Sequence, residues 1–222
     1  MCGRLLLSLG VLLVAANAYG DTFGSAVVQR SYDGTDACIG CLFAYAEVPA
    51  GDVGQTLDTW AFYDAYAADI GHEITPLLFL NITGTEFQII GIGTTRTNTG
   101  TGVQSHPYGS VAGTDILGPN EYFGWRDGNV DGSVTNAGNV SLDLAGGPGL
   151  FYFIGPPYEY PGSIGVGGPY VFTQEFTTAR TYSINATAVP EPMSIVLLGG
   201  IVLLMSHLIR QRKDRRGTEI AH

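Results

Sequence analysis

Val140-Ser141-Leu142-Asp143-Leu144 decides the fold class, because apolar and polar residues alternate along it. Successive side chains of a β-strand point to opposite faces, so this alternation predicts a strand with one buried face. Tyr182-Ser183-Ile184-Asn185-Ala186 repeats the pattern. The two segments therefore predict half-buried β-strands.

Short segments rich in Val, Ile, Thr, Tyr and Phe fill the middle of the chain, and Gly, Pro and Asn separate them. Segment 57–69 is ambiguous, since its alanines suit a helix, but we expect a strand because Trp60, Phe62, Tyr63 and Tyr66 favour one. We expect further strands at 42–48, 57–67, 74–82, 86–92, 121–125, 150–154 and 170–176. Many short strands with regularly spaced turns predict an all-β fold, an antiparallel β-sandwich of jelly-roll-like type.

The N-terminus has the three parts of a secretory signal peptide. Arg4 carries a positive charge, an apolar run covers residues 5–16, and Ala16-Asn17-Ala18 is a cleavage site of the small-x-small type. The run is shorter than a membrane span, which favours cleavage after Ala18 over an uncleaved anchor. We therefore expect residues 1–18 to be removed during secretion.

The C-terminus combines a proline-rich turn, an apolar segment and a basic tail. Val189-Pro190-Glu191-Pro192 precedes an apolar stretch over 193–209. The basic residues Arg210, Arg212, Lys213, Arg215 and Arg216 follow at once. As a helix the stretch would be about 25 Å long, enough to cross a thin bilayer. The charges predict that the tail stays in the cytoplasm and that everything before the helix is translocated.

This order of Pro190-Glu191-Pro192, Met193-Ser194, an apolar helix and an arginine-rich end resembles the PEP-CTERM sorting signal of Gram-negative bacteria that make exopolysaccharide. The resemblance covers about 189–216, and residues 217–222 continue past the point where the family usually stops. The same kind of tail also carries the label of an ice-binding protein C-terminal domain, which says nothing about what the body binds. The alternative is an ordinary single-pass anchor with juxtamembrane charge.

The resemblance implies recognition by an exosortase, a membrane-embedded cysteine transpeptidase-like enzyme. It would cut near Pro190-Glu191-Pro192 and release the body to the cell exterior. The implied partners are the general secretion machinery, the inner membrane for a limited time, and exopolysaccharide. The implied destination is the cell surface or the extracellular matrix.

Residues 19–188 form the body between these ends and have the size of one domain. The whole chain has a net charge of −10. Six of its ten basic and three of its twenty acidic residues lie outside the body, which leaves four against seventeen and a net charge of −13. An acidic surface of this kind repels nucleic acid, so we exclude nucleic-acid binding.

Cys38-Ile39-Gly40-Cys41 contains the only two cysteines of the body. In an oxidising exterior this pair predicts a small disulfide loop between Cys38 and Cys41. A redox CxxC is the alternative, but it requires the first cysteine at a helix start after a strand. A structural zinc site would need four ligands, so no zinc is implied.

The segment from Asp127 to Ser133 places oxygen-bearing side chains at alternate positions before a glycine. This is typical of the first half of a calcium loop, and it makes Asp127, Asn129 and Asp131 candidate calcium ligands. The bidentate carboxylate of the second half is missing, because Gly138 stands at its position, although Asp143 or Asp115 could supply one through the fold. A hairpin loop is the alternative. Calcium is the one candidate cofactor.

An aromatic and proline-rich region lies late in the body. Exposed aromatic rings on a β-sandwich stack on sugar rings in many carbohydrate-binding modules, whereas buried rings belong to the core. The candidate glycan-binding residues are Trp125, Tyr152, Tyr158 and Tyr160.

Catalytic patterns are weak in the body. His72 and His106 are far apart in sequence, and there is no nucleophile elbow, HExxH or P-loop. Acidic pairs such as Asp69 with Glu73 lack a spacing that indicates glycoside hydrolysis. We therefore expect a non-enzymatic exported protein with a structural or polysaccharide-interacting role, the alternative being a calcium-stabilised adhesion module that binds a protein partner.

Overall fold

The computed structural model describes residues 20–30, 40–132, 140–143, 152–154, 162–172, 174–175, 180–191, 200–201 and 203–209. For 152–154 and 174–175 it describes the backbone only. Asp21–Ala188 forms one compact unit, distinct from the chain ends on either side of it.

The regular secondary structure described in the compact unit is mostly β-strand, and this confirms the predicted all-β class. Its strands are β1 (Asp21–Gly24), β2 (Leu42–Glu47), β3 (Thr56–Asp64), β4 (Glu73–Thr83), β5 (Glu86–Ile92), β6 (Arg96–Thr97), β7 (Gly102–Pro107), β8 (Ala112–Gly113), β9 (Glu121–Asp127), β10 (Leu142–Asp143), β11 (Tyr152–Ile154), β12 (Gly167–Val171), β13 (Gln174–Glu175), β14 (Thr181–Tyr182) and β15 (Ile184–Val189). A short 3-10 helix, η1 (Ala67–Asp69), follows β3.

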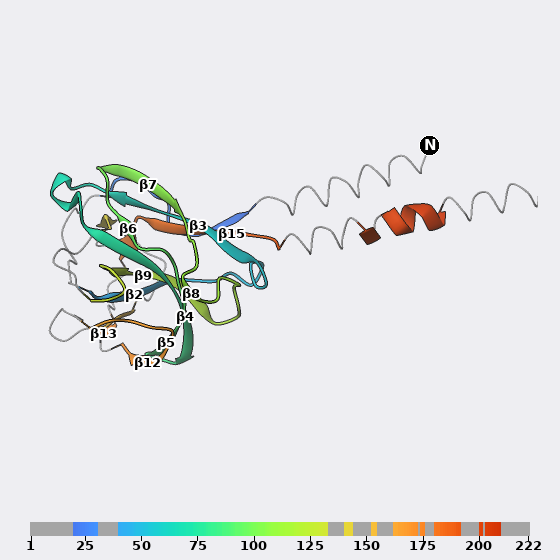
Figure 1. The fold of residues 1–222 in the computed structure, drawn as a ribbon. Coiled ribbons are helices and arrows are strands. Elements are labelled where there is room, and N and C mark those ends of the chain that lie inside the picture. The colour runs from blue at the N-terminus through green and yellow to red at the C-terminus, as the bar shows by residue number, and fades with distance from the viewer. Residues whose placement is uncertain are drawn as a thin grey trace, which may run out of the picture. The chain divides into compact units, whose positions relative to one another are not determined.

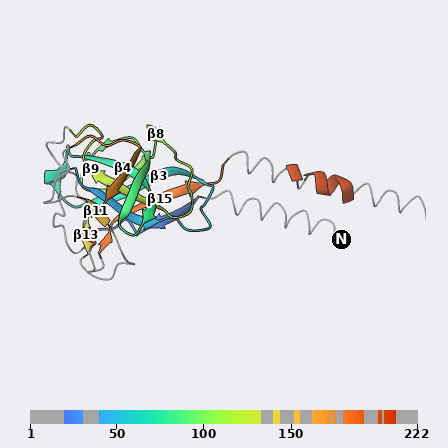
Figure 2. The ribbon, with the colours of Figure 1, turned by 90° about the horizontal axis from the view of Figure 1, so that it is seen from below.

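Within the described residues these strands form two main sheets and one small pair. The four-stranded sheet has the order β1-β15-β3-β7, and β10 pairs with β14. The larger sheet has the order β12-β5-β4-β9-β2-β11-β13, with β6 added beside β4 and β8 beside β5 (Figure 1). Figure 2 shows β11 and β13 side by side, and they pair through Tyr152 and Glu175. The registered strand pairs, including β4 with β9 and β2 with β9, are antiparallel.

An inner hydrophobic layer fills the space between the two sheets. Phe123 and Trp125 of the larger sheet join one buried cluster with Phe62, Ile184 and other residues of the four-stranded sheet. Because side chains from both sheets interlock in this layer, the two sheets pack face to face, in agreement with a β-sandwich.

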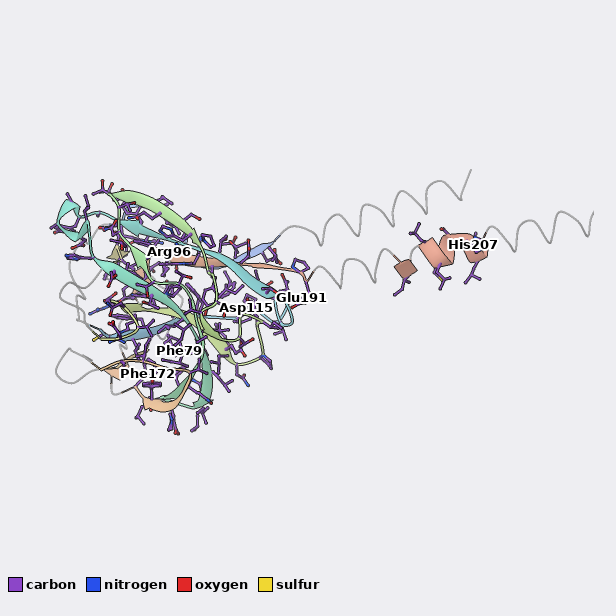
Figure 3. All side chains as sticks on the ribbon, in the orientation of Figure 1. Phe79, Arg96, Asp115, Phe172, Glu191 and His207 are labelled. Carbon is purple, nitrogen blue, oxygen red and sulfur yellow. The ribbon has the colours of Figure 1, made fainter. Side chains whose placement is uncertain are left out.

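An outer hydrophobic layer lies on the opposite face of the larger sheet. Phe79, Phe87 and Ile89 form it, and Ile164 and Phe172 cover them. Figure 3 labels Phe79 and Phe172, whose ring centroids are 5.8 Å apart in an edge-on contact. Strand β4 therefore buries residues on both faces, which explains its long apolar run.

The strand predicted over 57–67 is three residues too long. Strand β3 ends at Asp64, whose Oδ1 accepts a hydrogen bond of 2.7 Å from the backbone N–H of Tyr66. Such a side-chain bond turns the chain and ends the strand. The predicted strand at 170–176 is also wrong in its bounds, because β12 and β13 share it. Strands β1 and β7 were not predicted.

Residues 200–201 and 203–209 are helical. In the part of the chain that the structure describes, no helix is long and apolar enough to cross a membrane. The described residues thus give no support to the transmembrane helix predicted over 193–209, of which 193–199 and 202 lie outside them.

Candidate functional site

The predicted sorting motif begins directly after the last strand of the body. Strand β15 ends at Val189, and Pro190 and Glu191 follow it as the last described residues before the tail. The signal peptide over 1–18, Pro192, Arg210, Arg212, Arg215 and Arg216 lie outside the described residues and stay predictions. The structure therefore locates where the body ends and leaves the sorting signal untested.

The two ends of the body are joined to each other, and we call this junction the terminal clasp: residues 21–28 together with 183–189. In β1 and β15, Asp21 is paired with Ala188 and Gly24 with Asn185. Beyond the ladder, the N–H of Val28 donates to Ser183 Oγ at 2.8 Å. The first residues after the predicted signal peptide thus hold the last residues before the predicted sorting motif.

Tyr45 of β2 supports the clasp from the inner layer. Its hydroxyl bonds to Ser25 Oγ and accepts the N–H of Tyr182 at 3.1 Å. Burial raises the pKa of Tyr45, although the bonds to Ser25 and Tyr182 act in the opposite direction. The phenol is therefore a neutral hydrogen-bonding group that connects both ends of the body to the larger sheet.

The candidate calcium ligands begin with a carboxylate that already has a structural partner. Asp127 is 3% exposed, and its Oδ1 accepts a hydrogen bond of 2.9 Å from the indole N–H of Trp125. Asn129 is half-buried and Asp131 is exposed.

Asp143, considered as a further calcium ligand, forms a salt bridge with Arg30 at 3.2 Å. No group of three His, Cys, Asp or Glu side chains suited to a metal occurs among the described residues. Calcium binding stays a prediction.

Trp125 is a core residue, which corrects its assignment to a glycan-binding surface. It is 1% exposed, and its ring stacks on Phe43 with centroids 4.7 Å apart and planes 10° apart. A buried ring has no face left for a sugar. Six of the seven residues of strand β9 are buried and Tyr122 is half-buried, so the strand has no exposed residue.

Of the three tyrosines in the predicted glycan-binding group, the structure describes only the backbone of Tyr152. The backbone of Tyr152 lies in β11 and pairs with Ala44 and Glu175. The side chain of Tyr152, and Tyr158 and Tyr160 altogether, lie outside the described residues. Their role in sugar binding stays a prediction.

Cys41 is disulfide-bonded. It is fully buried beside the start of β2. Cys38, its predicted partner, lies outside the described residues, so the Cys38–Cys41 pairing stays a prediction.

The two histidines of the body have structural contacts in separate places. His72 Nδ1 lies 3.4 Å from Asp69 Oδ1, an ion pair when the ring is protonated. His106 of β7 packs beside Trp60, with centroids 5.6 Å apart. Burial, and secondly the charge of Arg96, lowers the pKa of His106. The imidazole of His106 is therefore predominantly a neutral packing group at pH 7.

The buried Glu121 and the half-buried Asp115 lie near the buried Tyr108, an arrangement that was not predicted from the sequence. Burial raises the pKa of Glu121, whose Oε2 accepts the N–H of Gly118 at 2.7 Å. Tyr108 is fully buried, and its hydroxyl has no hydrogen-bond partner within the described residues. Burial raises the pKa of Tyr108 strongly, and the charges of Asp115 and Glu121 add to the rise. Figure 3 labels Asp115. Only a known fold could have brought these residues together.

The described structure defines a mostly β protein made of antiparallel sheets. No model of a known protein family matches the chain, and no curated protein matches its sequence. The resemblance of 189–216 to a PEP-CTERM signal therefore rests on its own residues.

Proposed function

We propose that the chain is a non-enzymatic exported protein that an exosortase sorts to the cell surface or the extracellular matrix. The body, as a β-sandwich of jelly-roll-like type, then serves there as a structural or polysaccharide-interacting component. The observation that carries the proposal is the order Pro190-Glu191-Pro192, apolar segment 193–209 and basic tail 210–216. This order stands directly after the last strand of the body.

The architecture of the body supports separate roles for the body and for the two targeting segments. The compact unit spans Asp21–Ala188, so both proposed targeting segments lie outside it. The sequence patterns assign a signal peptide to 1–18 and a transmembrane helix to 193–209, and removal of both would leave the inner and outer layers complete. Both cuts can therefore be made without loss of a strand.

A structural role agrees better with the described surface than a dedicated sugar site built on Trp125. That ring belongs to the inner layer, so Tyr152, Tyr158 and Tyr160 are the members of the predicted group that could make a polysaccharide contact. The contact of Asp127 with Trp125 likewise gives the calcium-stabilised adhesion alternative no specific support.

Replacement of Pro190, Glu191 and Pro192 by alanine tests the sorting step. In a Gram-negative bacterium that carries an exosortase, we expect the triple variant to stay in the membrane fraction at its uncleaved mass. The wild-type body should appear outside with a lower mass. Release of the variant at the normal mature mass would refute the proposal.

A second experiment tests the polysaccharide contact. Retention of the purified body on the producer's exopolysaccharide is compared between the wild type and a Tyr158→Ala, Tyr160→Ala double variant. We expect weaker retention of the double variant, because the variant lacks two rings that the proposal stacks on the sugar. Equal retention of the two proteins would refute a sugar contact through these tyrosines and would leave the structural role.

A further inference from the structure

Strand β15 brings the folded body to within one residue of the sorting motif. Ala188 is still paired with Asp21, β15 ends at Val189, and Pro190 follows directly. The predicted membrane segment begins at Met193, so residues 190–192 alone would connect the strand to it. An extended chain covers about 3.3–3.6 Å per residue, and this connection therefore reaches about 10 Å.

A connection of this length leaves little room for an enzyme. The headgroup region is about 5–8 Å thick on each side of a bilayer, so the connection reaches barely beyond it. Proteins that bind an extended peptide pair with its backbone over several residues. An enzyme that cuts within 190–192 would therefore also need residues before Pro190, and in the folded body those residues are β15 itself.

The backbone of β15 is paired on both sides, and every second side chain of the strand is buried. The strand lies between β1 and β3 in the four-stranded sheet. Ile184, Ala186 and Ala188 are each 0% exposed within the inner layer. Loss of β15 from the sheet would expose these side chains and unpair strands on both sides, so the folded body holds it firmly.

The terminal clasp strengthens this hold. The hydroxyl of Ser183 both accepts the N–H of Val28 and donates to the carbonyl of Val28. The N–H of Ser25 donates to the carbonyl of Ile184 at 3.0 Å. Ser183 itself is 0% exposed, so its bonds to the exposed Val28 are part-buried.

We propose that pairing of β15 within the terminal clasp masks the sorting motif, so that cleavage by the exosortase and closure of the last strand exclude each other. This inference rests on the sorting function proposed above. The enzyme then acts on chains in which β15 has not yet paired or has opened locally. The rate of release depends on how stably the body holds β15.

A longer connection tests the masking directly. We would insert a flexible Gly-Ser linker of about eight residues between Val189 and Pro190 in the full chain. In an exosortase-carrying bacterium, a pulse-chase experiment measures the rate at which the body leaves the membrane fraction. We expect release several-fold faster than in the wild type. The matched control places the same linker between Gly217 and Thr218, where it should leave the rate unchanged.

Ser183→Ala weakens the clasp without altering the motif. We expect it to speed release of the unmodified chain, and to add little once the linker is present, because both changes relieve the same restriction. Thermal unfolding of the purified variant body, with its tail removed, verifies that it still folds.

The variant with alanine at Pro190, Glu191 and Pro192 distinguishes failure of masking from failure of sorting. If it blocks release while the linker leaves the rate unchanged, masking is overturned and sorting stands. If it is released like the wild type, sorting fails and the inference falls with it.

Discussion

The inner and outer layers of the larger sheet are closed in different ways. In the inner layer, each sheet contributes a stacked pair of aromatic rings, Trp125 with Phe43 from the larger sheet and Trp60 with Phe62 from the four-stranded sheet, to one buried cluster. Among the described residues, the outer layer is covered by segment 162–172, which contains the edge strand β12, and the ring centroids of Phe172 and Phe87 lie 4.6 Å apart. The inner layer therefore depends on the whole fold, whereas the outer layer depends on one covering segment.

The covering segment is held by the pairing of its edge strand β12 with β5 and by hydrogen bonds outside that pairing. Arg126 Nη2 donates to the carbonyl of Gly162 at 2.7 Å, and the N–H of Ile164 donates to the carbonyl of Val130 at 2.9 Å. At its other end, the N–H of Phe172 donates to the carbonyl of Thr85 at 2.8 Å. A segment attached in this way can open without loss of the inner layer.

Gly124→Ala should have the largest effect on stability, because Gly124 lies in β9, a central strand of the larger sheet with the inner layer on one face and the outer layer on the other. An added Cβ would come 1.8 Å from the carbonyl oxygen of Phe43 and 2.9 Å from the Phe79 ring. The β2–β9 pairing fixes that oxygen, so the sheet would have to separate. We expect a loss of about 4 kcal/mol or more in the free energy of unfolding, measured in urea.

Gly51→Ala is the matched control, since a Cβ there meets nothing within 4 Å. It should change the unfolding midpoint little. A Gly124→Ala body as stable as the control would contradict the pairing of β2 with β9.

Phe62→Ala tests the inner layer. Phe62 is 0% exposed and stacks on Trp60. Removal of a buried phenylalanine ring costs about 3–5 kcal/mol, and we expect the upper part of this range because two sheets fix the cavity walls. Amide hydrogen exchange should accelerate in both sheets together, and acceleration in β3 alone would argue against one cooperative inner layer.

Phe172→Ala makes the equivalent change in the outer layer. Phe172 is 2% exposed and contacts Phe79 and Phe87. We expect a smaller loss of about 2–3 kcal/mol, because the covering segment can collapse into the space or open. Faster exchange should be confined to 162–172 and β5. A loss equal to that of Phe62→Ala, with exchange raised everywhere, would mean that the two layers are equivalent.

Asp127→Ala separates a structural from a calcium-binding role at the edge of the inner layer. It leaves the buried indole N–H of Trp125 without the acceptor that Oδ1 provides, at a cost of about 1–2 kcal/mol. Asp127→Asn keeps an oxygen acceptor and should cost less. We expect the melting temperatures of all three proteins to respond alike to calcium and to chelator. A rise with calcium in the wild type alone would instead favour the loop as a metal site.

The local part of the fold could be predicted from the sequence. The predicted strand at 86–92 has the bounds of β5, and the alternation at 182–186 falls within β14 and β15. Period-two patterns are local, so they are visible without the fold. Strands β1 and β7 were missed because glycine and proline dilute their pattern, and their pairing partners are distant in sequence.

The face that a residue occupies could not be predicted. Trp125 was predicted to bind a glycan because it is one of several aromatic residues late in the body, but its ring is 1% exposed and belongs to the inner layer. Asp127 was predicted as a calcium ligand from the local spacing of oxygen-bearing side chains. That spacing does not show that Asp127 Oδ1 accepts a hydrogen bond from the indole of Trp125. Which faces are covered depends on contacts between segments far apart in the chain, and these are absent from any local pattern.

Glu121→Gln should have the smallest effect, and its sign depends on pH. Burial raises the pKa of Glu121 above its ordinary value of 4.5, so the folded body holds this proton more tightly than the unfolded chain does. The stability of the wild type therefore falls as the pH rises from about 4.5 through the raised pKa. Glutamine keeps an oxygen acceptor for the N–H of Gly118 and carries no charge to desolvate. At pH 7 the variant should match or exceed the wild type, by less than about 1 kcal/mol.

Glu47→Gln, at an exposed position, controls for the loss of one negative charge. Thermal unfolding of the three proteins between about pH 4 and pH 8 measures the difference, and the advantage of Glu121→Gln over Glu47→Gln should shrink toward acid. An advantage that grows toward acid would show that the Glu121 carboxylate stabilises the inner layer in its charged form. The inner layer would then be closed at this end by an ionised group, and its difference from the outer layer would be one of charge as well as of packing.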